Sequence, residues 1–257
     1  ATDFERAGLD GSLVGDLDPE ARTLEGYLFP DTYPLPRRDS AERVVAAMVS
    51  RFKAAFDMNL RARGSAAGLS VRDVVTLASL IEKETASADE RPLVSAVYRN
   101  RLKLGMPLQC DPTVIYALMR AGRWHGNLTR ADLQLESPYN PYRHSGLPPG
   151  PIASPGRASL EAAVSPADVP YLYFVSRNDG THAFARLAER SRKAMILSEG
   201  LIIYFEESEV LALGRDLSAQ PSFQAWIVDL CSPGLLRILQ KQLNPRLNQG
   251  SAPLKFG

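Results

Sequence analysis

The segment ASLIEKETA, residues 78–86, is the feature of this chain that most constrains its fold. It follows residues with apolar side chains at helical spacing, and it ends that apolar helix with two carboxylates, Glu82 and Glu84. A glutamate held against apolar side chains keeps its proton near neutral pH and can act as an acid. The segment therefore predicts a buried helix with a candidate acidic group at its carboxyl end.

The two glutamates belong to different sides of this helix. Glu84 continues the face of Leu77 and Ile81. Glu82 continues the face of Val75. At ~100° per residue the two carboxylates are about 200° apart, so they do not form one site. We expect one to line a cleft and the other to cap the helix, pair with a lysine or face solvent; the alternative is that both are ordinary helix-end charges.

Composition indicates an ordinary globular protein and excludes several function classes. The 257 residues suffice for one large domain or two smaller ones, with 45% hydrophobic and 23% charged residues. A net charge of +1 gives no electrostatic case for nucleic acid, and no stretch approaches the ~20 apolar residues of a membrane-spanning helix. Cys110 and Cys231 lack metal-site spacing, and His125 and His144 lack partners, so we predict no metal site.

Capping signals divide the first half of the chain into short helices. Residues 1–38, rich in Gly, Pro and Asp, are predicted to be extended, with short strands around Leu28–Phe29. Signals for a helix start then occur at Asp39 with Glu42, Ser70 with Asp73, Ser87 with Glu90, Asp111 before Pro112, and Thr129 with Asp132.

A long loop and a hairpin follow the helices. Residues 137–156, SPYNPYRHSGLPPGPIASPG, are too apolar for a disordered linker and too broken for a helix or strand. Ordered loops of this length are usually functional. The runs YLYFVS (171–176) and THAF (181–184), on either side of Asn178-Asp179-Gly180, predict a β-hairpin. The fold class is therefore α+β: a mainly helical domain with small hairpins and a long Pro/Gly loop.

A set of motifs in a fixed order carries a family resemblance. The motifs are LEGYLFPDTY (24–33), IEKETA (81–86), YRNRL (98–102), LQCDPTVIY (108–116), YNPY (139–142), GLPPGPIASPG (146–156), PYLYFV (170–175) and H-x-F (182–184). Over about residues 1–192 the chain resembles the YceG-like endolytic murein transglycosylases (the MltG family). Two departures are mild: Cys110 replaces a small hydroxyl residue usual in the family, and Pro141 stiffens the loop.

The resemblance implies an activity and a mechanism. Such an enzyme cleaves the β-1,4 bond between N-acetylmuramic acid and N-acetylglucosamine within peptidoglycan strands and leaves 1,6-anhydro ends. The resemblance identifies Glu84 as the catalytic residue, first as general acid and then as base. The muramic acid's own 6-hydroxyl is the nucleophile, so no water, metal or diffusible cofactor is needed.

Further residues are candidates for binding the substrate: Gln109, Asp111, Tyr139, Asn140, Tyr142 and His182. Amide groups suit sugar hydroxyls and N-acetyl groups, and tyrosine faces suit pyranose rings; the alternative is a tyrosine-rich loop packed on the core. Asp111 is a second carboxylate, a sugar-binding group or a plain N-cap, and His182 lines the cleft or is structural. Arginines 91, 99 and 101 are candidates for muramyl carboxylates or solvated helix charges.

The implied partners are peptidoglycan glycan strands and peptidoglycan synthases. The family implies a membrane anchor, with the enzyme facing the periplasm or cell wall. The chain starts without Met, and we expect the anchor and an N-terminal LysM-like domain to be missing or truncated from it.

The family pattern stops at about residue 194. The later runs SEGLIIYF, EESEVLALGRDLSAQPSF and QAWIVDLCSPGLLRILQKQL predict strand, helix, strand and helix, a C-terminal α/β segment. Residues 195–257 weakly resemble a fragment of leucine carboxyl methyltransferase-like enzymes that use S-adenosylmethionine. Their glycine-rich nucleotide loop is absent, so we predict no methyl transfer and expect a composite chain, with a catalytic domain at 1–192 and a foreign tail at 195–257.

Two other functions remain open at this point. A hydrolytic muramidase would use Asp111 to activate water. A non-catalytic peptidoglycan-binding module would use Glu84 only for its structure.

Overall fold

One helix, α4 (Val71–Glu84), packs against four other helices of the described fold. A capping box between Ser70 and Asp73 begins it, as the sequence predicts. Every residue from Val74 to Ile81 is buried, so this helix packs on all sides rather than on one apolar stripe. A charged side chain can therefore leave the core only near an end of α4.

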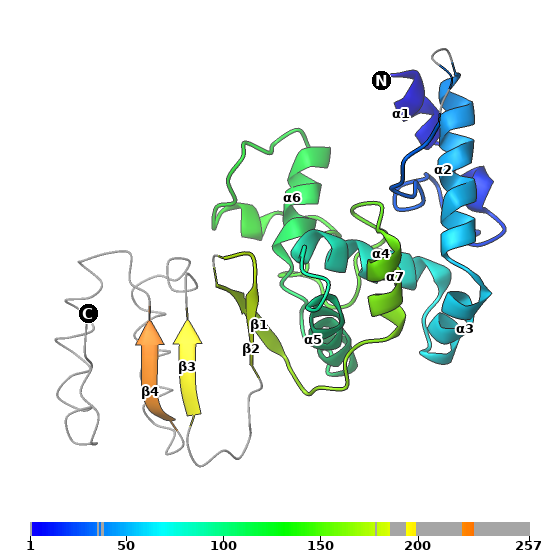
Figure 1. The fold of residues 1–257 in the computed structure, drawn as a ribbon. Helices are drawn as coiled ribbons and strands as arrows, with labels where there is room; N and C mark the ends of the chain where they lie inside the picture. Colours follow the sequence, from blue (N-terminus) through cyan, green and yellow to red (C-terminus); the bar gives the residue numbers. More distant parts are fainter. Residues whose placement is uncertain are drawn as a thin grey trace. The chain divides into compact units, whose positions relative to one another are not determined.

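The computed structural model describes residues 2–34, 36, 39–177, 179–185, 194–198 and 223–228. The chain divides into two units, one of residues 1–174 with 180–185 and one of residues 175–179 with 186–257. The first unit contains the helices, and the second is described at residues 175–177, 179, 194–198 and 223–228. Figure 1 traces both along the chain.

Helices α3, α5, α6 and α7 contact α4, and α1 packs against α2 (Figure 1). Aromatic side chains fill the core beside them, with Tyr27, Phe52, Phe56 and Tyr98 among the fully buried ones. The remaining elements of this unit are α1 (Asp3–Gly8), η1 (Gly11–Val14), α2 (Ala41–Ala55), α3 (Met58–Ala66), α5 (Arg91–Lys103), α6 (Asp111–Arg120), η2 (Asp132–Gln134) and α7 (Arg157–Val164).

The structure corrects three predictions about the N-terminal region. Residues 3–8 form α1, which begins with a capping box between Thr2 and Glu5 that the sequence interpretation overlooked. Residues 28–29 lie outside any strand, although Phe29 is buried in the core. Helix α2 begins one residue later than predicted, with Ser40 rather than Asp39 as its N-cap.

The predicted capping box of Ser87 and Glu90 is also wrong. Helix α5 begins at Arg91, and Glu90 occupies its N-cap position without a side-chain capping bond. The carboxylate of Glu90 instead accepts hydrogen bonds from Thr85 and from the distant His182. A tertiary contact has replaced the local cap.

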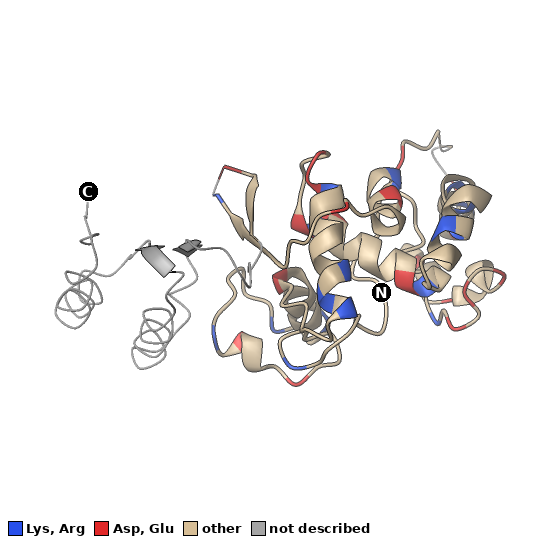
Figure 2. Cartoon of the chain, turned by 90° about the horizontal axis from the view of Figure 1, so that it is seen from below, with Lys and Arg blue, Asp and Glu red and all other residues tan. Residues whose placement is uncertain are grey.

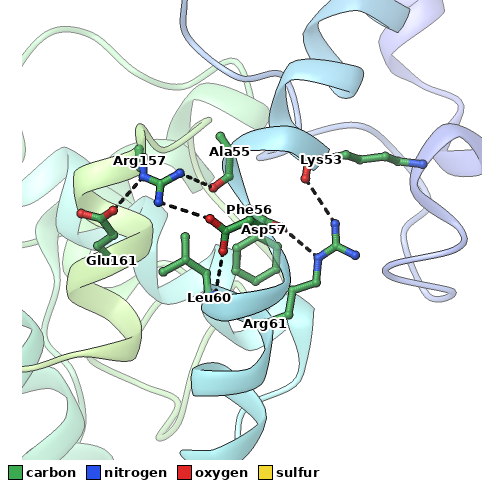
Figure 3. Close-up of polar contacts among 8 residues, drawn as sticks. All are labelled: Lys53, Ala55, Phe56, Asp57, Leu60, Arg61, Arg157 and Glu161. Atoms are coloured by element: carbon green, nitrogen blue, oxygen red, sulfur yellow. Dashed lines mark hydrogen bonds and ion pairs between the residues drawn. The ribbon is translucent and has the colours of Figure 1, made fainter.

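The junction of α2, α3 and α7 is held by polar contacts (Figure 3). Asp57 begins α3 by accepting a 3.0 Å bond from the Leu60 N–H, and it pairs with Arg157 at 3.3 Å. Arg157, the first residue of α7, also donates to the carbonyl of Ala55 and to Glu161. These contacts fix the start of α7, which packs along α4.

Strands β1 (Tyr173–Ser176) and β2 (His182–Ala185) are neighbours in a two-stranded sheet. The predicted hairpin is confirmed, and with the helices it makes the fold α+β. The ring of Phe174, on β1, packs against two other rings. Its centroid is 5.8 Å from that of Tyr98 and 5.3 Å from that of His182.

In the second unit, β3 (Ala194–Ser198) and β4 (Phe223–Val228) pair in parallel. Parallel neighbours require a crossover connection. Strand β4 falls on the predicted strand QAWIV, whereas β3 precedes the strand predicted at residues 198–205. Residues 199–205 of that predicted strand and the helices predicted in the tail lie outside the described residues.

Acidic and basic residues are interspersed over the helices in Figure 2, in keeping with the net charge of +1. In the described part of the chain, no single helix is long and apolar enough to cross a membrane; α3 and α4 satisfy length and composition only as a pair bent by 97°.

Candidate active site

Glu84 is the last residue of α4, and its side chain is partly buried where three helices meet. Its Oε2 accepts a 2.9 Å hydrogen bond from the Oη of Tyr98, on α5. The Sγ of Cys110, directly before α6, donates to the same oxygen over 3.6 Å. Both donors therefore act on Oε2, and among the described residues Oε1 has no donor.

The surroundings of Glu84 favour its protonated form. Burial raises the pKa of Glu84, whereas the hydrogen bond from Tyr98 lowers it. The negative charge of Asp111 raises the pKa of Glu84 further, and His182 and Cys110 lower it. The net pKa is raised, so Glu84 keeps its proton to higher pH than a free glutamate does, which is the property of a general acid.

Glu82 has other partners, in agreement with the helical spacing. Its Oε2 accepts hydrogen bonds from Ser159 Oγ at 2.6 Å and from the Gly156 N–H at 3.2 Å. Both donors lie at the start of α7, where a carboxylate also interacts favourably with the helix dipole. Glu82 thus joins two core helices, and Glu84 is the candidate acid.

Tyr98 and Cys110 are donors that the sequence interpretation missed, because neither was given a role at Glu84. Both are buried, at 0% and 2% exposed. Burial and the nearby negative charge of Glu84 raise the pKa values of both groups, so they stay protonated. Tyr98 lies in the YRNRL motif; a buried tyrosine hydroxyl needs a hydrogen-bond partner, which is the signal that could have found it.

Asp111 and Tyr142 come together beside this carboxyl group. Tyr142 Oη donates a 2.5 Å hydrogen bond to Asp111 Oδ1. Asp111 is the first residue of α6, and Cys110 rather than Asp111 occupies the N-cap position. The plain N-cap interpretation of Asp111 is therefore wrong, and its carboxylate remains a candidate for the site. Burial raises the pKa of Asp111, whereas the bond from Tyr142 lowers it; the net pKa is raised.

Gln109 lies at the entrance to α6 with an exposed side chain. Its backbone φ is 51°, in the left-handed region that glycine favours. Its N–H donates to the carbonyl of Pro141 over 3.3 Å, which ties the α6 entrance to the long loop. Its Oε1 accepts a 3.3 Å bond from Arg101.

Asn140 holds the long loop in shape. Its side chain is 0% exposed. The amide nitrogen donates to the carbonyls of Leu133 and Leu135 at 2.8 Å each, and Oδ1 accepts a 3.0 Å bond from the Tyr142 N–H. With its amide used in this way, Asn140 positions Tyr142 and does not present a group to a sugar.

Tyr139 turns away from Tyr142, although only two residues separate them. Its ring centroid is 5.0 Å from that of Tyr116 on α6, and the Arg120 guanidinium lies 5.6 Å from its centroid. These residues line a separate groove. The structure therefore divides the two candidate tyrosines between two places.

His182 forms a tight pair with Glu90. The Nδ1 of His182 is 2.7 Å from Glu90 Oε2, and its backbone N–H donates to Oε1 at 2.8 Å. Thr85, next to the candidate acid, adds a 3.1 Å bond to Oε2. Burial acts to raise the pKa of Glu90, but the hydrogen bonds from His182 and Thr85 outweigh it and lower that pKa. His182 is thereby fixed close enough for its charge to act on Glu84.

Two of the three candidate arginines serve the fold. Arg101 is buried and donates to the carbonyls of Leu172 and Leu108 at 2.7 and 2.9 Å, with Tyr173 under its guanidinium at 5.0 Å. Arg99 donates to the carbonyl of Ala67 at 3.1 Å. These guanidinium groups hold backbone segments together rather than standing in solvent.

The described residues contain no group of three His, Cys, Asp or Glu side chains arranged to hold a metal ion. What the arrangement offers is one carboxyl group whose raised pKa favours the protonated form, with one oxygen that has no donor among the described residues, beside a second carboxylate. Such a pair can transfer a proton to a substrate oxygen and stabilise positive charge that develops next to it.

Comparison with known proteins gives this site a context. An endolytic murein transglycosylase of Bacillus subtilis is 41% identical over 172 residues, which cover 66% of this chain and 47% of that protein. An endolytic murein transglycosylase of Streptococcus pneumoniae is 37% identical over 161 residues, covering 60% of this chain and 28% of that protein. The chain thus spans about half, or less, of the curated relatives it matches.

A solved structure and a family profile extend the comparison. The crystal structure of a YceG-like protein from Listeria monocytogenes aligns with a TM-score of 0.62 and 34% identity, covering 73% of this chain and 64% of that one. The profile of the YceG-like family matches residues 4–195, which include Glu84 and every residue described around it. The chain belongs to the YceG-like family.

Proposed function

We propose that this chain is the catalytic part of an endolytic lytic transglycosylase that cleaves peptidoglycan glycan strands between N-acetylmuramic acid and N-acetylglucosamine. The observation that carries the proposal is the partly buried Glu84 carboxyl group, whose pKa is raised. The names of the bacterial relatives support the substrate class.

In the proposed reaction, Glu84 is both acid and base. Its proton passes to the glycosidic oxygen as the bond from that oxygen to the anomeric carbon of the muramic acid breaks. The 6-hydroxyl oxygen of the same sugar then bonds to the anomeric carbon, and its proton passes to Glu84. The carboxyl group is regenerated, the products are a 1,6-anhydro end and a free 4-hydroxyl, and no water is consumed.

The hydrogen bonds at Glu84 support one of its two oxygens as the proton donor of the proposed reaction. Oε2 accepts from Tyr98 and Cys110, so it is the oxygen best suited to carry negative charge. In the proposed reaction the transferable proton is therefore carried by Oε1, which has no donor among the described residues. The two donors also stabilise the carboxylate formed after proton transfer, which limits the rise of the Glu84 pKa.

The neighbouring residues have proposed roles that follow from their contacts. Asp111, held by Tyr142, favours the protonated form of Glu84 and the positive charge that develops at the anomeric carbon. Gln109 is exposed and offers its amide to sugar hydroxyls. His182, fixed by Glu90, lines the site from the hairpin.

The decisive experiment digests purified glycan strands with the wild-type chain and with Glu84→Gln. We expect 1,6-anhydro ends from the wild type and a loss of cleavage in the variant of about 10²-fold or more, with binding of the strands retained. Reducing ends would replace the proposal with a hydrolase. Undiminished cleavage by Glu84→Gln would refute the role of this residue, and a wild type that binds without cleaving would indicate a binding module.

One observation favours a hydrolytic muramidase as the second candidate. Asp111 lies close enough to Glu84 to affect its pKa, so a second carboxylate is available to activate water. The chemistry of the new ends separates the two reactions directly.

The setting and the boundaries of the protein are also proposals. We place it at the cell envelope, with peptidoglycan synthases as candidate partners. The family profile ends at residue 195, which supports the interpretation of residues 195–257 as a foreign segment with no part in the reaction.

A further inference from the structure

A groove of about 1150 Å³ lies apart from the proposed acid. Its walls come from α1, from residues 19–28, from the first turn of α4, from the second half of α6 and from the long loop between Pro138 and Ser154. Glu84, Asp111, Tyr142 and His182 are not among the residues that line it. The proposed function leaves this groove unused.

Two helices connect the groove with the proposed acid. Arg72 lines the groove at the start of α4, twelve residues before Glu84, or about 18 Å along the helix axis. Arg120 lines it at the end of α6, nine residues after Asp111, or about 14 Å. The groove is thus too far away to hold the reacting sugars and near enough for another part of the same strand.

Aromatic side chains give the groove a wall suited to sugar rings. Tyr116 and Tyr139 have centroids 5.0 Å apart with planes inclined by 51°. The exposed guanidinium of Arg120 lies 5.8 Å from the first centroid and 5.6 Å from the second. Aromatic bodies with polar tips, next to hydrogen-bond donors, match a ligand with apolar ring faces and hydroxyl edges.

The charges of the groove nearly cancel. Three acidic residues line it, Glu5, Glu20 and Glu25, together with three arginines, Arg22, Arg72 and Arg120. The guanidinium of Arg72 is already paired with Asp18 at 3.0 Å. A groove for a strongly anionic or cationic polymer would carry an excess of one sign. A hydroxyl-rich polymer of modest charge density, such as a peptide-free glycan strand with one muramyl carboxylate in each disaccharide, fits this mixture, because both kinds of group can hydrogen-bond to hydroxyls and the guanidinium groups can also meet the carboxylates.

We propose that this groove is a distal subsite for sugar residues of the glycan strand, several units away from the bond that Glu84 cleaves. The inference rests on the proposed function for the identity of the strand. Binding at a distance from the reacting bond supplies free energy that orients and distorts the reacting sugar. The groove therefore makes the enzyme prefer long strands over short ones.

The test compares peptide-free peptidoglycan glycan strands of two lengths, one too short to reach from Glu84 to the groove and one long enough. Wild type should cleave the long strand with the higher kcat/KM. Arg120→Ala and Tyr116→Ala should each lower the ratio of kcat/KM values, long over short, about tenfold. An unchanged ratio, or an equal loss on both substrates, would overturn the subsite.

Met119→Ala is the matched control, since Met119 is 60% exposed on the same helix and does not line the groove. It should leave the ratio unchanged. A loss equal to that of Arg120→Ala would overturn the inference by showing that the effect belongs to α6 as a whole. Because Arg120 is exposed and its removal leaves the core intact, thermal unfolding of Arg120→Ala should match that of the wild type.

Binding measured without cleavage separates this inference from the proposed reaction. In the Glu84→Gln background, adding Arg120→Ala should weaken binding of the long strand about tenfold and leave binding of the short strand as it was. If the wild type cleaves strands but Arg120→Ala does not weaken binding of the long strand, the subsite is refuted and the proposed reaction stands. If Arg120→Ala weakens binding of the long strand but the wild type cleaves no strand, the proposed reaction is refuted and the subsite stands. A groove that binds free stem peptides and ignores peptide-free strands would overturn the subsite.

Discussion

Tyr98 and Glu84 lie fourteen residues apart, and the phenol of the first donates a 2.9 Å hydrogen bond to Oε2 of the second. The ring of Tyr98 is fully buried and packs edge-on against Phe174, which packs in turn against His182. The direction of the hydroxyl is therefore fixed by the packing of α5 against the hairpin. The acid is oriented by the core of the protein rather than by its own helix.

Replacing Tyr98 with Phe removes the hydroxyl and keeps the ring. The hydrogen bond lowers the pKa of Glu84, so its loss raises that pKa. Because the proposed reaction needs protonated Glu84, the alkaline limb of the pH–kcat profile should move to higher pH. The free energy of unfolding should fall by about 1–2 kcal/mol, since a buried acceptor loses its donor. A limb that stays in place or moves to lower pH would contradict the contact.

Asp111→Asn should move the same limb in the opposite direction. The negative charge of Asp111 raises the pKa of Glu84, so removing the charge lowers that pKa and shifts the limb to lower pH. The amide oxygen of Asn keeps an acceptor for Tyr142. The size of the rate loss also separates the two candidate reactions: a general base for water is worth about 10²–10⁴-fold, whereas a purely electrostatic contribution should cost less.

Local signals in the sequence predicted much of the fold. The capping box at Ser70 and the apolar run after it identified α4, and the turn residues around Gly180 identified the hairpin. The N-terminal helix was missed because its Gly- and Pro-rich surroundings outweighed the short capping box at Thr2. Glu90 was misread because a contact with His182, ninety-two residues away, replaced the local cap.

The sequence predicted the candidate acid, because a carboxylate at the end of an apolar helix is visible in the residue pattern itself. It did not predict the contacts around that acid. The end of the apolar helix indicated a pair of candidate acids, and the family resemblance selected Glu84 between them. The roles of Tyr98 and Glu90 depend on how α5 and the hairpin pack, which helical and strand periodicity do not specify. Asn140 was assigned to the sugar because its amide suits one, whereas burial turned that amide to the backbone.

Glu84→Gln should be more stable than wild type at neutral and alkaline pH. The folded-state pKa of Glu84 is raised, so the folded protein binds this proton more tightly than the unfolded chain, whose glutamates titrate near pH ~4.3. Wild-type stability from this group is complete below that pH and is lost as pH rises through the folded pKa. Glutamine does not ionise and so keeps its contribution at all pH values. The difference in Tm, variant minus wild type, should therefore increase by a few degrees from pH 4 to pH 8. A constant difference would contradict the raised pKa.

Glu90→Gln should have the reverse pH dependence. The folded-state pKa of Glu90 is lowered, so its contribution to stability is present above the unfolded pKa of about 4.3 and is lost as pH falls through the folded pKa. At neutral pH the variant should lose about 1–3 kcal/mol of unfolding free energy, and the difference from wild type should shrink in acid. Glu161→Gln is the control, because its pair with Arg157 is exposed and should be worth less than about 0.5 kcal/mol. If Glu90→Gln and Glu161→Gln lose the same unfolding free energy, the buried Glu90–His182 pair stabilises the fold no more than an exposed pair does.

Gln109→Gly tests whether the left-handed backbone at the entrance to α6 is kept for function. A non-glycine residue there costs about 1 kcal/mol, and the bond of its side chain to Arg101 is long, at 3.3 Å. The free energy of unfolding of the variant should therefore be unchanged or slightly higher, while KM for glycan strands rises because the amide is gone.

Gly105→Ala is the control that measures backbone strain. At Gly105 φ is 67° and no atom lies within 4 Å of an added Cβ, so a loss of about 1 kcal/mol in unfolding free energy would come from backbone strain alone. If Gln109→Gly instead destabilises the fold as much as Gly105→Ala does, the side chain of Gln109 serves the structure and its assignment to the substrate is wrong.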